Sequence, residues 1–229
     1  ETLLTTAEKF SSIASLFGRS YPQTELEDAW REVLFNQFHD ILPGSSIREN
    51  YIDATKRYEV AEKTAGYELR GALTAIARQV DTRSARKDQA IVVFNPLSWS
   101  RADVVTLHLP EGETGPFAIF DNKGKEMPSQ SIRTGQYNRD ILFIADKVPA
   151  FGYRVYELRK AKPSSYASDL TSSAHQIENR FYRVTVDPDS GWVRSIFDKE
   201  NDRELLANGF GNQLQILEDK PREWDAWNI

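Results

Sequence analysis

The chain has no cysteine among its 229 residues, which excludes disulfide bonds, thiolate metal ligands and cysteine nucleophiles. Any metal site must therefore use histidine and carboxylate side chains, and a reducing compartment, the cytoplasm, is the expected location. No stretch approaches the roughly 18 consecutive apolar residues of a membrane span, and the sequence shows no basic-then-apolar leader. We therefore expect no membrane partner.

The chain also lacks a net positive charge. The net charge is -5 and the isoelectric point is about 5.4, so the chain has no broad positive field that would attract nucleic acid. Hydrophobic residues make up 40% of the sequence and aromatic residues 11%, which is ample for a packed core. The composition predicts a globular chain with one large domain or two modest ones and without a nucleic-acid partner.

The first part of the chain carries apolar residues at helical spacing, in three successive patterns. We predict that a helix starting at the Thr5–Glu8 capping box ends at Gly18, that a second starts at the Thr24–Glu27 capping box and continues to Ile41, and that a third runs from Ile47 to Val80. The third pattern has a coiled-coil-like seam, and the three together predict a helical bundle over residues 1–86.

The spacing of apolar residues changes to two after the charged segment Asp81–Asp88, which predicts a domain boundary there and β-structure over residues 87–229. A serine-rich stretch near 162–173 is predicted to be a surface loop. The predicted fold class is α+β multidomain: a three-helix bundle followed by an antiparallel β-sandwich. The expected strands are 91–94, 105–109, 117–120, 141–145, 153–158, 181–186, 192–197 and 214–217.

The segment Phe35–Ser46 is the strongest functional signal, because it places His39 and Asp40 next to each other at the predicted C-terminal end of the second helix. Pro43 and Gly44 then supply a stop signal. An imidazole and a carboxylate on a rigid support beside a loop suit a metal or sugar site. A helix-end histidine is, however, most often structural, because it can donate to a carbonyl or interact with the helix dipole.

The segment Phe35–Ser46 resembles the signature of glycoside hydrolase family 38, the metal-dependent retaining α-mannosidases, in its bacterial and cytosolic form. Four further segments resemble blocks of the same family in the same order, so the resemblance covers nearly the whole chain. They are 93–99 (VFNPLSW), 177–184 (IENRFYRV), 187–191 (DPDSG) and 224–229 (WDAWNI).

This resemblance implies a role for each residue of the pair. His39 corresponds to the histidine that completes the family's zinc site, and Asp40 would bind hydroxyls of a mannose held at the metal. The family's nucleophile and remaining metal ligands belong to an N-terminal domain with no counterpart here, so we nominate no catalytic residue in this chain. The expected cofactor is Zn²⁺ or another divalent metal, with the site incomplete in this chain, and the expected partner is a mannose-containing oligosaccharide.

We therefore expect an internal fragment, namely the helical middle domain plus the start of the C-terminal β region. The chain opens on Glu1 inside a helical pattern and its one methionine is Met127, which agrees with that expectation. The fragment alone is expected to be inactive, and homo-oligomerisation stays open.

Two alternatives remain at this stage. Trp224, Asp225 and Trp227 could contact a sugar, although aromatic residues at such density are more often core. The whole chain could also be a non-catalytic carbohydrate-binding or structural module.

Overall fold

The computed structural model describes residues 1–83, 90–110, 112–113, 115–133, 139–207, 209–220 and 222–223. It divides into two units, Glu1–Ser164 and Ser165–Ile229. The dividing point lies in the predicted surface loop near 162–173, whose residues are mostly exposed. Among the described residues, none of the helices combines the length and the apolar character that a membrane span requires.

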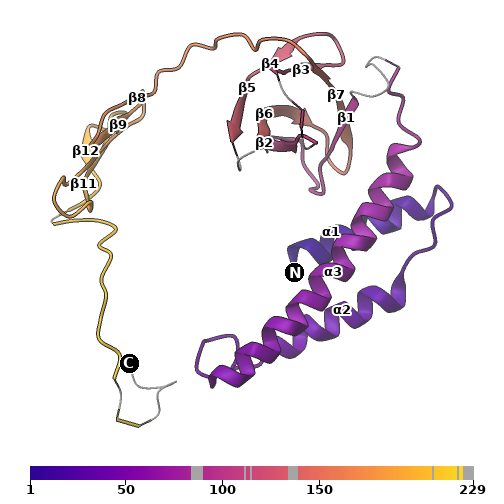
Figure 1. Ribbon diagram of the computed structural model, residues 1–229, viewed down its shortest axis with the longest axis horizontal. Coiled ribbons are helices and arrows are strands. Elements are labelled where there is room, and N and C mark those ends of the chain that lie inside the picture. Colours follow the sequence, from indigo (N-terminus) through magenta and orange to yellow (C-terminus); the bar gives the residue numbers. More distant parts are fainter. Residues whose placement is uncertain are drawn as a thin grey trace. The chain divides into compact units, whose positions relative to one another are not determined.

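The first unit begins with three α-helices, α1 (Thr2–Ser15), α2 (Gln23–Asn36) and α3 (Arg48–Ala77). The longest, α3, lies along both of the others, as Figure 1 shows. Small residues of α3 make this close packing possible: Ala61 and Ala65 join Leu4, Ala7, Leu26, Ala29 and Val33 in a buried cluster. The predicted three-helix bundle is confirmed.

Both predicted capping boxes are wrong. Helix α1 starts three residues before Thr5, whose hydroxyl instead donates back to the carbonyls of Glu1 and Thr2. Helix α2 starts after Pro22, because the Leu26 N–H already bonds to the Pro22 carbonyl at 3.1 Å. Neither helix has a side-chain cap. The spacing of threonine and glutamate alone therefore did not locate the helix starts.

Two antiparallel sheets complete the first unit and pack face to face. One sheet has the strand order β1-β7-β3-β4 and the other β2-β6-β5. Buried side chains from both sheets fill the space between them, and the rings of Phe143 on β6 and Tyr156 on β7 meet edge to face at 5.2 Å. The strands are β1 (Ala90–Phe94), β2 (Arg101–His108), β3 (Ala118–Asp121), β4 (Glu126–Met127), β5 (Ser129–Arg133), β6 (Arg139–Val148) and β7 (Tyr153–Arg159).

The helices and the first sheet are joined by an apolar contact. Phe10 of α1 and Phe94 of β1 lie 5.6 Å apart between ring centroids, and Phe94 also contacts Tyr153. The Lys9 ammonium donates to the Pro96 carbonyl at 3.3 Å. The predicted fold class, three helices followed by antiparallel β-structure, is therefore confirmed.

The second unit is a single antiparallel sheet with the order β12-β11-β10-β9-β8. Its strands are β8 (Thr171–Ser172), β9 (Gln176–Glu178), β10 (Tyr182–Val186), β11 (Val193–Asp198) and β12 (Arg203–Glu204). The strand predicted over 214–217 is wrong: those residues pair with no other strand and three of them are strongly exposed apolar residues, Leu214, Ile216 and Leu217. Apolar content alone indicated a strand where no neighbouring strand is present to hydrogen-bond.

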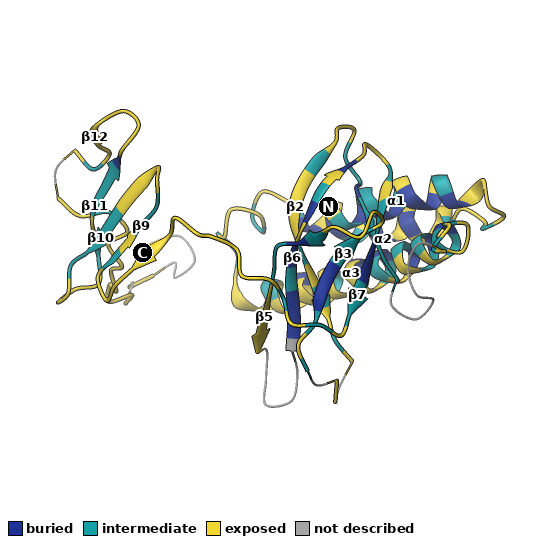
Figure 2. Ribbon diagram, turned by 90° about the horizontal axis from the view of Figure 1, so that it is seen from above, coloured by how far each residue is buried: buried dark blue, intermediate teal, exposed yellow. Residues whose placement is uncertain are grey.

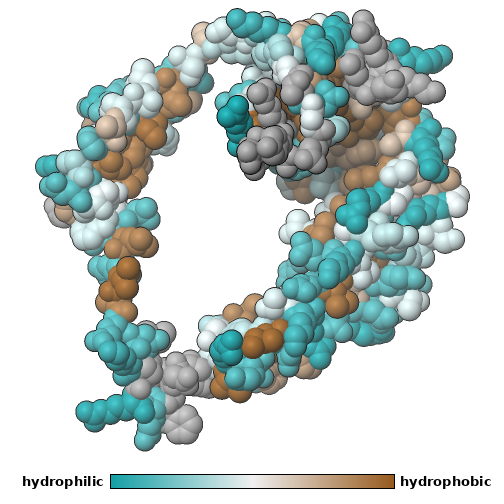
Figure 3. Space-filling model, viewed as in Figure 1, coloured by the Kyte–Doolittle hydropathy of each residue, from teal (hydrophilic) through white to brown (hydrophobic). Residues whose placement is uncertain are grey.

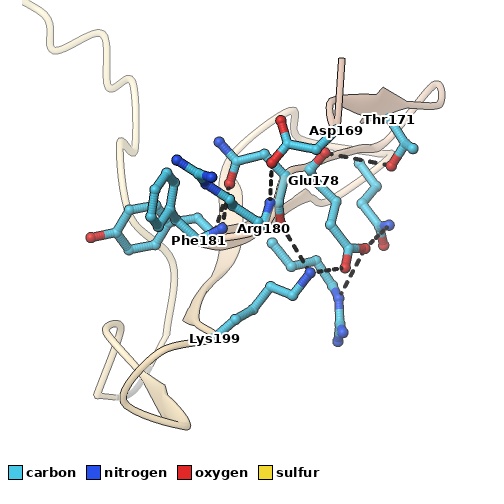
Figure 4. Close-up of polar contacts among 10 residues, drawn as sticks. Asp169, Thr171, Glu178, Arg180, Phe181 and Lys199 are labelled. Carbon is cyan, nitrogen blue, oxygen red and sulfur yellow. Dashed lines mark hydrogen bonds and ion pairs between the residues drawn. The ribbon is translucent and has the colours of Figure 1, made fainter. Parts of the chain in front are cut away.

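Polar contacts hold this second sheet together. No hydrophobic residue among those described in the unit is fully buried, and Figure 2 shows little dark blue there. The Glu178 carboxylate instead accepts from Lys199 at 2.8 Å and from Arg183 at 3.3 Å, and the Asp169 carboxylate accepts from the Arg180 backbone N–H (Figure 4). Stability of this unit should therefore depend on its carboxylates being charged.

Acid should loosen the second unit for this reason. Hydrogen bonds from Lys199, Ser190, Asn201 and Ser195 lower the pKa values of Glu178, Asp187, Asp198 and Glu204, respectively, below the ordinary values of 4.5 for Glu and 3.8 for Asp. A lowered pKa in the folded state adds stability above the ordinary value, and that stability is lost as the pH falls through the folded value.

We expect the amide resonances of Ser190 and Asn201 to stay unchanged down to about pH 4 and to move only below it. The measurement is an NMR pH titration of the chain, with the amide of Gly44, an exposed turn residue that donates to the Ile41 carbonyl, as the comparison. Midpoints at or above 3.8 for the Asp187 and Asp198 side chains would contradict this expectation.

Candidate functional site

The residues that sequence reasoning singled out lie in the connection between α2 and α3. Helix α2 ends at Asn36, so the predicted continuation of this helix to Ile41 is wrong. From Gln37 onwards the chain forms successive turns, in which the Ile41 and Leu42 N–H groups both donate to the Phe38 carbonyl. His39 and Asp40 thus project from a hydrogen-bonded turn that follows the helix end.

The turn is attached to α3 by two polar side chains. Asn36 is fully buried, and its amide donates to the Ala54 carbonyl of α3 at 2.9 Å. The Tyr51 hydroxyl lies 3.4 Å from the carbonyls of Asp40 and Ile41 and accepts from the Ser46 N–H at 3.1 Å. Because Tyr51 contacts the backbone of Asp40 and Ile41 and that of Ser46, it ties together two parts of the turn that carries His39 and Asp40.

Sequence reasoning missed Asn36 and Tyr51 as supports of the site. A signal for Asn36 was present, since it follows the apolar position Val33 by three residues and so lies on the buried face of α2. A polar residue on such a face needs a hydrogen-bond partner. Tyr51 fitted the apolar seam of the third helical pattern, and nothing in the sequence indicates where its hydroxyl points.

The His39 and Asp40 side chains face each other in solvent. Nε2 of His39 lies 3.8 Å from Oδ2 of Asp40, and the side chains are 79% and 41% exposed. The His39 ring also lies against the Phe38 ring, with 4.1 Å between centroids. In the part of the chain that the structure describes, the imidazole makes no other polar contact, so both groups remain accessible to a ligand.

The metal donors at this position are few. Among the described residues, no group of three or more His, Cys, Asp or Glu side chains could hold a metal ion. His39 nevertheless suits a place in a donor set, because its imidazole is exposed and an exposed carboxylate stands beside it. The two residues fit one part of a metal and sugar site, and further ligands would have to come from outside these described residues.

Exposed apolar residues flank the pair along the chain. Figure 3 shows hydrophobic atoms at the surface near the α2–α3 connection. Five large apolar side chains between residues 34 and 47 are each more than half exposed. We call this the turn patch: Leu34, Phe35, Phe38, Leu42 and Ile47. The Arg57 guanidinium covers part of it, 4.2 Å above the Phe35 ring.

The other candidate positions give no site. Trp224, Asp225 and Trp227 lie outside the described residues. His108 contacts Asp140 at 2.9 Å on the β2–β6 pair, away in sequence from His39. Thus the structure brings together His39 and Asp40 and adds no third ligand to them among the described side chains.

Comparisons with known proteins support the family. Residues 1–76 match the family model for the alpha-mannosidase middle domain, and residues 177–229 match that for the C-terminal domain of glycosyl hydrolases family 38. Alpha-mannosidase 2C1 of Mus musculus is 26% identical over 100% of this chain, and that of Homo sapiens is 27% identical over the same share. In both cases the chain spans 20% of the length of the relative.

A solved structure shows the same fold. The alpha-mannosidase from Enterococcus faecalis V583 superposes with a TM-score of 0.68 at 18% identity, over 88% of this chain and 27% of its own. The bundle, the sheets and the two matched domains therefore define a piece of a multidomain glycoside hydrolase. The chain belongs to glycoside hydrolase family 38, and the relatives named above are α-mannosidases.

Proposed function

We propose that this chain is part of an α-mannosidase that hydrolyses terminal α-linked mannose with retention of configuration. The observation that carries the proposal is the similarity to α-mannosidases along the full chain together with an exposed His39–Asp40 pair on a braced turn. Because the chain spans only about a fifth of the length of its relatives, most of the enzyme would lie outside these residues.

In this proposal His39 supplies one imidazole ligand to a divalent metal, with Zn²⁺ the expected ion, and Asp40 accepts hydrogen bonds from sugar hydroxyls. A carboxylate suits that role because a charged acceptor binds a hydroxyl more strongly than a neutral one. The metal, when bound, supplies positive charge that holds sugar hydroxyls and stabilises the transition state. Tyr51 and Asn36 keep the turn in place, so the two side chains need little rearrangement to bind.

The turn patch supports the same proposal. Its apolar side chains flank the pair in sequence and are exposed among the described residues. We propose that the remainder of the enzyme covers this patch and so brings its own ligands and carboxylates to His39. Retention requires two carboxyl groups about 5 Å apart, one as nucleophile and one as acid and base, and these would come from that remainder.

The test compares the full-length protein with the 229-residue chain. We expect the full-length protein to hydrolyse 4-nitrophenyl α-mannoside, to release the α-anomer first by NMR, to lose activity after chelation and to regain it with Zn²⁺. The 229-residue chain alone should show no turnover above the uncatalysed rate. Turnover by the chain alone, or a full-length protein that binds mannosides without hydrolysing them, would contradict the proposal, and the second result would favour a non-catalytic module.

A further inference from the structure

A second candidate site lies in the bundle, at the other half of α3. The turn that ends α1 and the C-terminal half of α3 lie side by side (Figure 1). Between them they line a cavity of about 440 Å³ that is open to solvent. Its charged lining consists of three arginines, Arg19, Arg70 and Arg78, and no acidic side chain of the described residues lines it. The remaining lining residues are Phe17, Gly18, Tyr67, Gly71, Thr74 and Ala75.

The position of Arg19 depends on Gly71. A Cβ atom at position 71 would lie only 2.5 Å from Cζ of Arg19, so any other residue there would displace the guanidinium. Glycine inside a helix lowers the stability of that helix. At position 71 its lack of a side chain leaves room for the Arg19 guanidinium. Seated there, Arg19 donates from Nη2 to Glu68 at 2.5 Å, and Glu68 is almost fully buried.

The charges in and behind this cavity do not balance. Glu68 offsets one guanidinium, whereas Arg70 and Arg78 form no ion pair with any acidic side chain that the structure describes. Both arginines are exposed. Arg70, Thr74 and Arg78 follow Tyr67 by three, seven and eleven residues, so the four side chains share one face at the C-terminal end of α3. Three guanidinium groups against one carboxylate leave an excess of two positive charges, which matches a dianion.

We propose that this cavity binds a phosphate monoester carried on a ring. Guanidinium groups suit phosphate because their planar array of donors can bond two oxygens at once. The exposed rings of Tyr67 and Phe17, which are 67% and 46% exposed, offer flat apolar surfaces for the ring of the ligand. The inference is independent of the proposed mannosidase activity, since it uses none of the residues near His39.

The test uses isothermal titration calorimetry of the full-length protein with phenyl phosphate and, separately, with inorganic phosphate. We expect saturable binding of phenyl phosphate with a Kd of about 1 mM or tighter, and weaker binding of inorganic phosphate because it has no ring. Arg70→Gln and Arg78→Gln should each weaken phenyl phosphate binding by about tenfold, as expected for one charged hydrogen-bonding partner. Arg48→Gln, an exposed arginine at the start of α3, is the matched control and should bind like the wild type.

Gly71→Ala provides a second variant that does not remove a charge. It should displace Arg19 and weaken binding, while circular dichroism shows the helices intact, because only the end of a flexible side chain has to move. Absence of saturable binding to the wild type, or equal affinity in the Arg70→Gln/Arg78→Gln double variant, would overturn the assignment. Weakening by Arg48→Gln to the same extent would also overturn it, because it would show attraction by general charge alone.

Discussion

His39→Ala in the full-length protein should remove most of the bound divalent metal and lower kcat/KM for an α-mannoside by more than about a hundredfold. Loss of a group that only supports a ligand typically costs ten- to a hundredfold in metal affinity or activity, so loss of a proposed ligand should cost at least that much. The fold should be unaffected, because the ring is 79% exposed and its nearest partners, Phe38 and Asp40, share its turn. Metal analysis and steady-state kinetics are the two measurements.

The chain offers a matched control in His175, an exposed histidine of the second unit. His175→Ala should leave metal content and turnover unchanged. Asp40→Asn separates the two proposed roles: it should keep the metal but lower kcat/KM, since an amide is a weaker acceptor for sugar hydroxyls than a carboxylate. If His39→Ala retains both metal and activity, His39 is not the ligand and a structural role for it is the better explanation.

The long periodic elements were predictable from the sequence because each repeats its signal many times. The seam of α3 recurs over 30 residues, and alanines at 54, 61, 65 and 72 are buried as the spacing requires. Apolar patterns likewise located β1, β2, β3, β6 and β7 of the first unit. Strands β4, β5, β8, β9 and β12 were not predicted. Four of them have only two or three residues, too few to show a period of two, and β5 contains a single apolar residue.

The sequence predicted which segment carries the candidate site, but it did not predict the backbone conformation of that segment. Adjacent His39 and Asp40 followed by Pro43 and Gly44 indicated a candidate site at the end of the second helix, whereas the structure places both side chains on the turn that follows the helix. Helix α2 stops at Asn36, after which the Gln37 backbone leaves helical geometry, and the buried Asn36 amide bonds to α3. That bond depends on how two helices pack, which local spacing does not encode. The arginine cavity was likewise invisible, because it forms only when α1 and α3 come together.

Asn95 shows the same limit, since the sequence analysis singled it out only as a member of the 93–99 segment. The side chain is 2% exposed and lies where β1 leaves its sheet. Its amide group lies within hydrogen-bond distance of the carbonyls of Trp99, Pro149 and Val148, at 2.7, 3.0 and 3.2 Å. Its Oδ1 accepts from the Leu97 N–H at 3.1 Å. One side chain thus joins the turn after β1 to the segment between β6 and β7.

Asn95→Ala should therefore lower the free energy of unfolding of the first unit by about 2–4 kcal/mol, because it leaves buried carbonyls without donors and also opens a small void. Asn122→Ala, in the exposed turn after β3, is the matched control and should change stability by less than about 0.5 kcal/mol. Urea denaturation of the chain, monitored by circular dichroism, measures both. Since Asn95 offers two N–H donors to three carbonyls, Asn95→Asp should also destabilise, because a carboxylate supplies none. A loss below about 1 kcal/mol for Asn95→Ala would mean that water replaces the amide at little cost and that the β6–β7 segment is held elsewhere.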